Sequence, residues 1–383
     1  MSWLDNAARQ HSEDWRSQGL ERTPALFGTG QTPVATIDGR EYVLFSSSNY
    51  LGLAEHPAVT EAASDALNQF GAGSGGSRLT TGTTDLHTQL ERDFARFLGY
   101  DDAVFFSAGF MANAGVLQAL AGPDTLILSD ERNHASIIDG CRLAKAQGAT
   151  VRIYRHRDPA HVDELLRQHS GEAIVVTDGL FSMDGTLAPV PELLTICRDR
   201  GAALMVDDAH GTGTLGARGR GITEHFSLID DHPDILVATS SKALGVEGGA
   251  VATSAPVAAL LRQKARTFVY STSSTPATCA AVSAAIGVLE GQDSPVPALH
   301  RNVRRLAGHL GIGDWTSPII PVPIGNEAKA VNASAALREA GYFVPAIRWP
   351  TVPRGAAMLR VTVMATHTDA QIDGLAQTLA QLR

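Results

Sequence analysis

Seven short apolar runs, separated by segments of helical length, constrain the fold of this 383-residue chain more than any other feature. They lie at residues 103–107, 125–128, 150–154, 173–177, 203–206, 235–239 and 250–253. Consecutive apolar positions indicate strands that are buried on both faces, as in a parallel sheet between layers of helices. We therefore expect an α/β fold whose large domain holds a mostly parallel seven-stranded sheet covered by helices.

The segments before these runs and after them have different patterns. Residues 34–37 and 41–45 flank an Asp38-Gly39 pair, which is typical of a β-hairpin because both turn positions need a positive φ. Gly, Asp, Ser and Pro gather at residues 291–297, which indicates a boundary. We expect an N-terminal helix and hairpin segment (1–45), a large α/β domain (46–290) and a small C-terminal α+β domain (291–383).

The small domain is expected to alternate strands and helices. Apolar runs at residues 319–324, 342–347 and 358–363 indicate strands, and residues 328–340 indicate a helix that ends at Gly341. The last helix is expected to begin at Thr368, since Thr368 and Gln371 form a capping-box pattern.

Composition excludes several classes of protein. Lysine and arginine total 31 against 40 acidic residues, a formal net charge of −9, so binding to nucleic acid is not expected. The three cysteines lie far apart, which favours a reducing cytoplasm over a disulfide framework or a zinc site, and the 13 histidines show no metal-binding spacing. Neither a signal peptide nor an apolar segment of about 18 residues is present, so we expect a soluble, cytoplasmic protein.

An acid and a histidine follow the fifth apolar run directly. Asp207 comes just after the run, and His210 stands three residues later, before a glycine. Open α/β sheets bind ligands at the carboxyl ends of their strands, so both side chains are candidates for chemistry. The alternative is structural, because an aspartate after a strand often caps the next helix and a histidine there often lies on the surface.

A single lysine, Lys242, follows the sixth run in the segment Thr239-Ser-Ser-Lys. Burial at a strand end lowers the pKa of a lysine and favours the neutral amine that a Schiff base requires. A lysine whose head group reaches solvent, or one that contacts a phosphate, is an open alternative. A nucleotide-hydrolysing loop is disfavoured, because the chain lacks the G-x-x-x-x-G-K-[ST] motif.

Two further segments place polar groups at the ends of predicted strands. Residues 105–113 indicate a strand, a tight turn and a helix start, where backbone N–H groups and the helix dipole favour a phosphate. His134 follows the second run. The glycines at 71–76 match a dinucleotide fingerprint, but a helix precedes them and a loop follows, so they indicate a loop with close backbone approach.

Together these features match the needs of pyridoxal 5′-phosphate. That cofactor requires a lysine for a Schiff base, an acid against its ring nitrogen, a cradle for its phosphate and a flat group over its ring. The chain offers a strand-end lysine, a strand-end aspartate, an anion-binding helix start and a histidine. We therefore expect pyridoxal phosphate as the cofactor.

A series of motifs makes the inference more specific. They are Asn49-Tyr-Leu-Gly52, Gly73-Ser-Gly-Gly-Ser-Arg78, Asn133-His134-Ala-Ser136, Phe181-Ser182-Met-Asp184-Gly185, Val206-Asp207-Asp-Ala-His210-Gly211, Thr239-Ser-Ser-Lys242, Tyr270-Ser-Thr-Ser273 and Arg348-Trp-Pro-Thr351. In these motifs, and in their order and spacing over the whole chain, the protein resembles the α-oxoamine synthases, which are pyridoxal phosphate-dependent transferases of fold type I.

The resemblance implies how the catalytic centre is built. Lys242 would carry the cofactor and serve as the catalytic base. Asp207 would keep the ring nitrogen of the cofactor protonated, and His134 would stack on the ring. His210, assisted by Ser182, would bind the phenolic oxygen of the cofactor.

It also implies contacts to the phosphate and to the substrates. The family works as a homodimer with shared sites, so the phosphate would bind Gly109, Phe110 and Thr239 of one subunit and Ser271 and Thr272 of the partner subunit. The carboxylate of the amino acid would bind Arg360. The remaining substrate contacts would be Arg22, Ser48, His134, Arg348 and Thr351.

The implied activity joins an amino acid to an acyl thioester with loss of CO2. Within the family, the chain is most similar to the branch that condenses L-alanine with a pimeloyl thioester, carried by coenzyme A or by acyl carrier protein, in biotin biosynthesis. One alternative is glycine C-acetyltransferase, which joins glycine to a short acyl group. A cofactor carrier without turnover is disfavoured, since binding alone would not need both Asp207 and His134.

Overall fold

The computed structural model describes residues 2–21 and 23–382, and a seven-stranded sheet forms its centre. The strand order is β3-β9-β8-β7-β6-β4-β5. Only β9 runs antiparallel to its neighbours, so the expected mostly parallel sheet is confirmed. The strands are β3 (Asp102–Phe106), β4 (Thr125–Asp130), β5 (Thr150–Tyr154), β6 (Glu172–Asp178), β7 (Ala203–Asp207), β8 (Ile235–Thr239) and β9 (Gly249–Thr253).

All seven predicted runs are strands of this sheet, and alternation of their side chains explains the apolar pattern. In β3, Val104 and Phe106 join the apolar cluster on one face, while Ala103 and Phe105 join the cluster on the other face. Successive side chains of a strand point to opposite faces, so a sheet covered on both sides needs apolar residues at every position.

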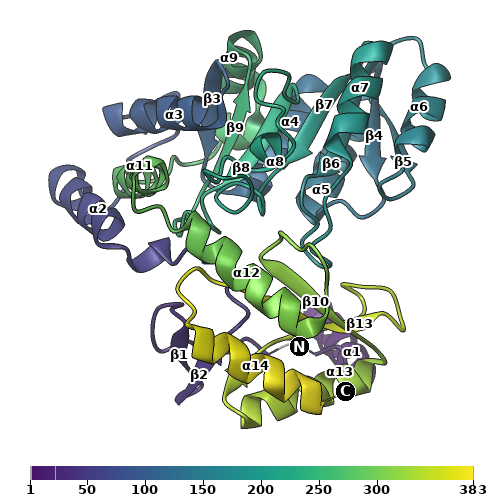
Figure 1. Ribbon diagram of the computed structural model, residues 1–383. Helices are drawn as coiled ribbons and strands as arrows, with labels where there is room; N and C mark the ends of the chain where they lie inside the picture. The colour runs from purple at the N-terminus through teal and green to yellow at the C-terminus, as the bar shows by residue number, and fades with distance from the viewer. Residues whose placement is uncertain (1, 22, 383) are drawn as a thin grey trace.

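Helices form a layer on each face of the sheet (Figure 1). One layer contains α4 (Gly109–Leu120), α5 (Ala135–Ala146), α9 (Ala255–Lys264) and α10 (Arg266–Val269). The other contains α2 (Pro57–Phe70), α3 (Asp85–Leu98), α6 (Pro159–Arg167), α7 (Val190–Arg200), α8 (Ile222–His225) and α11 (Pro276–Glu290), with the short helix η1 (Leu53–Glu55) before α2.

The predicted hairpin is confirmed, and it pairs with the far end of the chain. β1 (Val34–Ile37) and β2 (Arg40–Leu44) run antiparallel around Asp38 and Gly39, whose φ angles of 51° and 80° are both positive. β2 also pairs in parallel with β11 (Tyr342–Phe343). The N-terminal segment therefore shares a sheet with C-terminal residues, and the predicted boundaries at residues 45 and 290 stay predictions.

A second small sheet has the order β10-β13-β12, formed by β10 (Ile319–Gly325), β13 (Ala357–Thr362) and β12 (Ala346–Ile347). The run at 342–347, expected to be one strand, is divided between the two small sheets, because β11 pairs with β2 and β12 pairs with β13. Pro345 lies between the two pieces and has no N–H for a ladder. Its carbonyl oxygen instead accepts a hydrogen bond from the backbone N–H of Arg360 at 3.2 Å.

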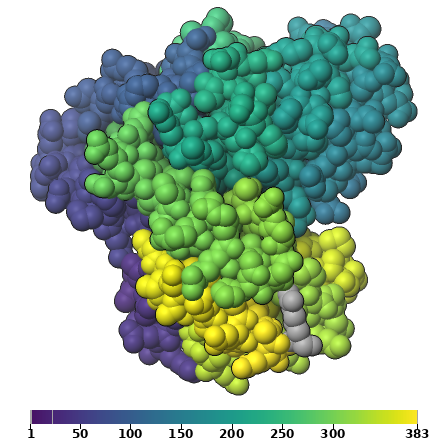
Figure 2. All heavy atoms as spheres, viewed as in Figure 1, coloured from purple at the N-terminus to yellow at the C-terminus, as the bar shows by residue number. Residues whose placement is uncertain are grey.

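The remaining helices surround these small sheets. They are α1 (Trp3–Ser17), α12 (Val296–Leu310), α13 (Glu327–Glu339) and α14 (Asp369–Gln381). The capping box predicted at Thr368 is present, since its side chain and that of Gln371 each accept a hydrogen bond from the other residue's backbone N–H. Figures 1 and 2 show the first and last segments of the chain together below the large sheet. Within the described residues, no helix combines the length and apolar character needed to cross a membrane.

Candidate active site

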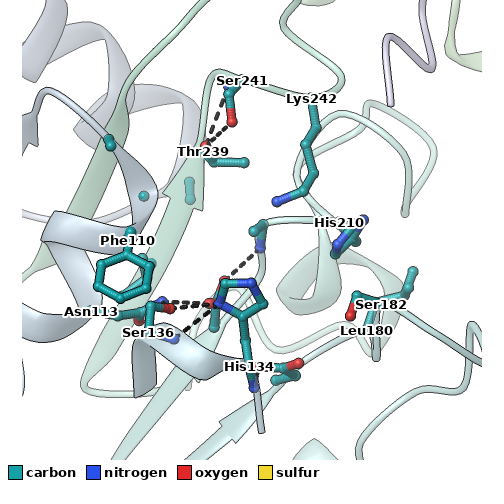
Figure 3. Close-up of a pocket in the computed structure, with 17 residues that line it drawn as sticks. Phe110, Asn113, His134, Ser136, Leu180, Ser182, His210, Thr239, Ser241 and Lys242 are labelled. Carbon is teal, nitrogen blue, oxygen red and sulfur yellow. Dashed lines mark hydrogen bonds between the residues drawn. The ribbon is translucent and has the colours of Figure 1, made fainter. Parts of the chain in front are cut away.

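A cavity of about 220 Å³ opens at the carboxyl ends of β6, β7 and β8 (Figure 3). Because these strands are parallel neighbours, their last residues meet at one edge of the sheet. The cavity brings together eight residues that the sequence singled out, and their roles stay predictions: Gly109, Phe110, His134, Ser182, Asp207, His210, Thr239 and Lys242.

Lys242 follows β8, and its side chain extends toward the rings of His134 and His210 (Figure 3). Burial lowers the pKa of its ammonium group, which favours the neutral amine. The negative charge of Asp207 opposes that shift. Burial and the charge of Asp207 therefore act in opposite directions on the protonation of Lys242, and burial is the larger effect.

Asp207 ends β7 and is buried, with each carboxylate oxygen bound by a donor. Oδ2 accepts a hydrogen bond of 2.6 Å from Nδ2 of Asn113, and Oδ1 accepts one of 2.9 Å from the backbone N–H of Ala209. These two bonds fix the orientation of the carboxylate at the edge of the sheet.

His134 begins α5 as its N-terminal cap and is connected to Asp207 through side chains. Nδ1 of His134 lies 2.7 Å from Oγ of Ser136 and accepts from the Ser136 backbone N–H at 3.3 Å. Oγ of Ser136 in turn accepts from Nδ2 of Asn113 at 2.9 Å. Asn113 therefore donates to both Asp207 and Ser136, and burial lowers the pKa of the His134 imidazole, which keeps the ring neutral.

An anion cradle lies where α4 begins at Gly109. Its cap residue, Ala108, provides no side-chain acceptor, and no acidic residue occupies the first turn, so the first N–H groups of the helix are available to a ligand. Thr239 faces this turn, with its Oγ1 2.8 Å from both Oγ of Ser241 and the carbonyl oxygen of Gly248. Backbone N–H groups and hydroxyls on one side of the cavity are suited to a phosphate.

Two side chains reach the site from outside the large sheet. Arg360, on β13, donates from Nε to the carbonyl oxygen of Ser182 at 2.6 Å and is only 8% exposed. Tyr50, in the segment after β2, has its hydroxyl 2.8 Å from Nδ1 of His210. Arg360 and Tyr50 therefore contact residues that line the cavity, Ser182 and His210, but are not lining residues themselves.

Several predicted residues lie away from this cavity. Ser271 and Thr272 adjoin a different part of the surface, where the carbonyl oxygen of Thr272 accepts from Oγ of Ser107 at 3.2 Å. Arg348 donates to the carbonyl oxygen of Gly19 and accepts from the backbone N–H of Thr351. Neither Arg348 nor the exposed Thr351 lines the cavity, and the half-buried Ser48 does not line it either. Arg22 lies outside the described residues.

Four lining residues with polar side chains were not among the predicted site residues: Asn113, Ser136, Asp178 and Ser241. Asp178 ends β6 just as Asp207 ends β7, so the strand-end pattern that indicated Asp207 also points to Asp178. Asn113 lies four residues after Gly109 on α4, which puts both on one face of the helix. The described residues contain no group of three or more His, Cys, Asp or Glu side chains that could hold a metal ion.

Comparison with known proteins places the chain in a family. The model of the aminotransferase class I and II family matches residues 40–379. The chain belongs to this family. The expected resemblance to the α-oxoamine synthases, and with it fold type I, is confirmed by relatives and by solved structures.

Two relatives illustrate this likeness within the family. The chain is 43% identical to an 8-amino-7-oxononanoate synthase of Geobacter sulfurreducens, over 96% of this chain and 95% of the relative. It is 46% identical to the biotin biosynthesis bifunctional protein BioWF of Corynebacterium kroppenstedtii, over 99% of this chain. The matched region is 58% of that bifunctional relative, so the chain corresponds to part of it.

A solved structure agrees with this family assignment. Serine palmitoyltransferase from S. paucimobilis, with a bound pyridoxal phosphate–myriocin adduct, superposes with a TM-score of 0.91 at 29% identity. The superposition covers 100% of this chain and 98% of that one.

The cavity fits pyridoxal phosphate, the cofactor expected for an α-oxoamine synthase. A Cβ at Gly109 would lie 3.2 Å from Oγ1 of Thr239, so the glycine leaves the anion cradle open. Oδ1 of Asn113 is buried and has no hydrogen-bond partner among the described residues, which leaves an acceptor beside the cavity. Asp207 ends β7, and Lys242 follows the neighbouring strand β8. A cofactor that is held by an amine and whose ring nitrogen faces an acid requires such a pair.

Proposed function

We propose that the protein is an 8-amino-7-oxononanoate synthase, which joins L-alanine to a pimeloyl thioester and releases CO2 and a free thiol in biotin biosynthesis. The observation that carries the proposal is the convergence of Lys242 and Asp207 on one cavity that has a phosphate cradle. The relatives that bear this enzyme's name support the choice of substrates. Bound pyridoxal phosphate would supply an electron sink for the negative charge that develops at the amino-acid Cα and again during decarboxylation.

The chain's own residues would handle the protons. Nζ of Lys242 would take the proton from the Cα of alanine and return one after CO2 is lost, which requires the neutral amine that burial favours. Asp207, oriented by Asn113 and by the backbone of Ala209, would stabilise a proton on the ring nitrogen of the cofactor. His134 would cover the face of the ring in its neutral form.

Arg360 would bind the carboxylate of the amino acid, because it is a buried guanidinium already fixed at the cavity by Ser182. On the acyl side, Arg348 contacts Gly19, three residues before Arg22, which supports a site for the pimeloyl chain between these segments. Thr351 and Ser48 would complete that side.

The protein would act as a homodimer in the cytoplasm, with Ser271 and Thr272 of the partner subunit binding the phosphate. Support comes from their position, since these residues on the described chain lie away from its own cavity. Sedimentation velocity at micromolar concentration should give the mass of two chains, and a monomer that retains full activity would contradict shared sites.

The experiment that tests the reaction compares substrate pairs with cofactor-loaded protein and uses Lys242→Ala as the blank. L-Alanine with pimeloyl-coenzyme A should release thiol and give a product with the mass of 8-amino-7-oxononanoate. A parallel assay with pimeloyl-acyl carrier protein identifies the preferred carrier. Release only from glycine with acetyl-coenzyme A would assign another α-oxoamine synthase activity, and no release with cofactor bound would favour a carrier.

A further inference from the structure

Tyr50 is a buried tyrosine whose hydroxyl is hydrogen-bonded to His210 of the active site. Its side chain is 0% exposed, and Oη lies 2.8 Å from Nδ1 of His210, a residue that lines the cavity. Figure 3 shows His210 beside the end of Lys242. Within residues 2–21 and 23–382, the hydroxyl of Tyr50 has no second hydrogen-bond partner, and Nε2 of His210 has none at all.

The direction of this hydrogen bond follows from the burial of Tyr50. A buried hydroxyl that accepted from Nδ1–H would leave its own hydrogen without an acceptor, which costs more than leaving one lone pair unused. The hydroxyl of Tyr50 therefore donates, and Nδ1 of His210 accepts.

The protonation state of His210 determines whether its other ring nitrogen, Nε2, carries a hydrogen. Burial, then the positive charges of Lys242 and Arg360 and the nearby His134 ring, hold the pKa of His210 well below its usual value. A neutral imidazole carries one hydrogen, and with Nδ1 acting as the acceptor that hydrogen is on Nε2.

The backbone of Tyr50 is hydrogen-bonded to a residue that follows a strand of the second small sheet. Its carbonyl oxygen accepts a hydrogen bond of 2.7 Å from the backbone N–H of Ala365. Ala365 follows β13, the strand that carries Arg360. The position of the Tyr50 hydroxyl is therefore coupled to the same segment that places Arg360.

We propose that Tyr50 is a positioning residue that holds His210 in its Nε2–H tautomer, so that His210 donates a hydrogen bond into the cavity. The acceptor would be an oxygen of the bound cofactor, and this last part rests on the proposed function. Tyr50 is not among the residues that line the cavity and would act through the imidazole of His210.

The tautomer is measured by ¹⁵N NMR on the full-length, cofactor-loaded protein labelled at histidine. The signals of His210 are assigned as those that are absent from the spectrum of the His210→Gln variant. We expect Nε2 to carry the hydrogen in the wild type, Tyr50→Phe to give a mixture of tautomers, and Tyr100→Phe to match the wild type. Tyr100 is the matched control because its buried hydroxyl donates to the carbonyl oxygen of Pro233, away from the cavity. A hydrogen on Nδ1 in the wild type, or an unchanged tautomer in Tyr50→Phe, would overturn the proposal.

The absorption of the bound cofactor gives a second readout. Loss of an oriented donor to a charged oxygen should raise the pH midpoint of its spectral change by about one unit in Tyr50→Phe. In the His210→Gln background the same substitution should add no further shift, because Tyr50 acts through His210. Additive shifts would contradict the proposal. Neither readout uses a pimeloyl thioester, so failure of the proposed reaction is recognised separately by the absence of product.

Discussion

Asp178 and Asp207 are paired in register at the ends of two neighbouring parallel strands, and both line the same cavity. Asp178 is buried, and that burial, then the charge of Asp207, raises its pKa well above the ordinary value. Two adjacent buried carboxyl groups share a site most favourably when one is neutral. We infer that Asp178 is the neutral member, and its Oδ1 accepts from the backbone N–H of His134 at 3.2 Å.

This arrangement predicts different effects of the same substitution on the two acids. Asp178→Asn replaces a neutral acid by a neutral group of the same shape and should change cofactor affinity by less than about threefold. Asp207→Asn removes the charge that would face the ring nitrogen and should weaken binding at least about tenfold. Spectral titration of cofactor-free protein measures both. An equal loss in the two variants would show that Asp178 carries its charge in the site.

The sequence was sufficient to predict the large sheet and its reactive edge. Short apolar runs that alternate with segments of helical length indicate strands buried on both faces, and the carboxyl ends of parallel neighbours meet at one edge of the sheet. For that reason the sequence alone predicts that the side chains of Asp207, Lys242 and His134 lie close together. The hairpin turn at Asp38 and Gly39 was equally predictable, because so few residues accept two positive φ angles.

The contacts that sequence did not predict all depend on tertiary packing. Asn113 lies on α4 among small apolar residues, and only the packing of α4 against α5 shows that it bridges Asp207 and Ser136. Tyr50 and Arg360 come from segments far from the sheet in sequence. The division of residues 342–347 between two sheets likewise depends on which strands lie nearby, because Pro345 interrupts the run but does not determine the partner of either piece.

Asn113 provides a test of how the Asp207 carboxylate is held. Asn113→Ala leaves Oδ2 of Asp207 without its 2.6 Å donor and should lower cofactor affinity about tenfold, the usual effect of losing a hydrogen bond to a charged group. Gln118→Ala, farther along the same helix and outside the cavity, should leave the affinity unchanged. Wild-type affinity in Asn113→Ala would mean that the backbone of Ala209 orients Asp207 alone.

Arg360 should control the use of the amino acid rather than the binding of the cofactor. Arg360→Lys keeps the positive charge but loses the planar pair of donors, so KM for the amino acid should rise about 10- to 100-fold while the cofactor spectrum is unchanged. Arg354→Lys is a matched control, because Arg354 lies over the ring of Trp349 and not at the cavity. If KM is unaltered and the spectrum changes, Arg360 serves the cofactor instead.

The buried carboxyl group of Asp208 should make the free energy of unfolding depend on pH. Asp208 directly follows Asp207 and is fully buried, and this burial raises its pKa to about 8. The backbone N–H of Ile222 and the hydroxyl of Thr212 donate hydrogen bonds to Oδ2, which partly opposes the rise in pKa. An aspartate in the unfolded chain has lost its proton above its ordinary pKa of 3.8. Between pH 4 and 8 the folded state therefore binds one more proton than the unfolded state.

The sign of the effect follows from that difference in bound protons. The free energy of unfolding should fall as pH rises through this window, by up to about 1.4 kcal/mol per pH unit for this group. Asp208→Asn cannot titrate, so its stability relative to the wild type should improve steadily from pH 5 to pH 8. Urea unfolding at several pH values measures this difference. Asp124→Asn, at an exposed position, should keep the wild-type slope, and parallel curves for Asp208→Asn and the wild type would show that Asp208 stays ionised in the folded protein.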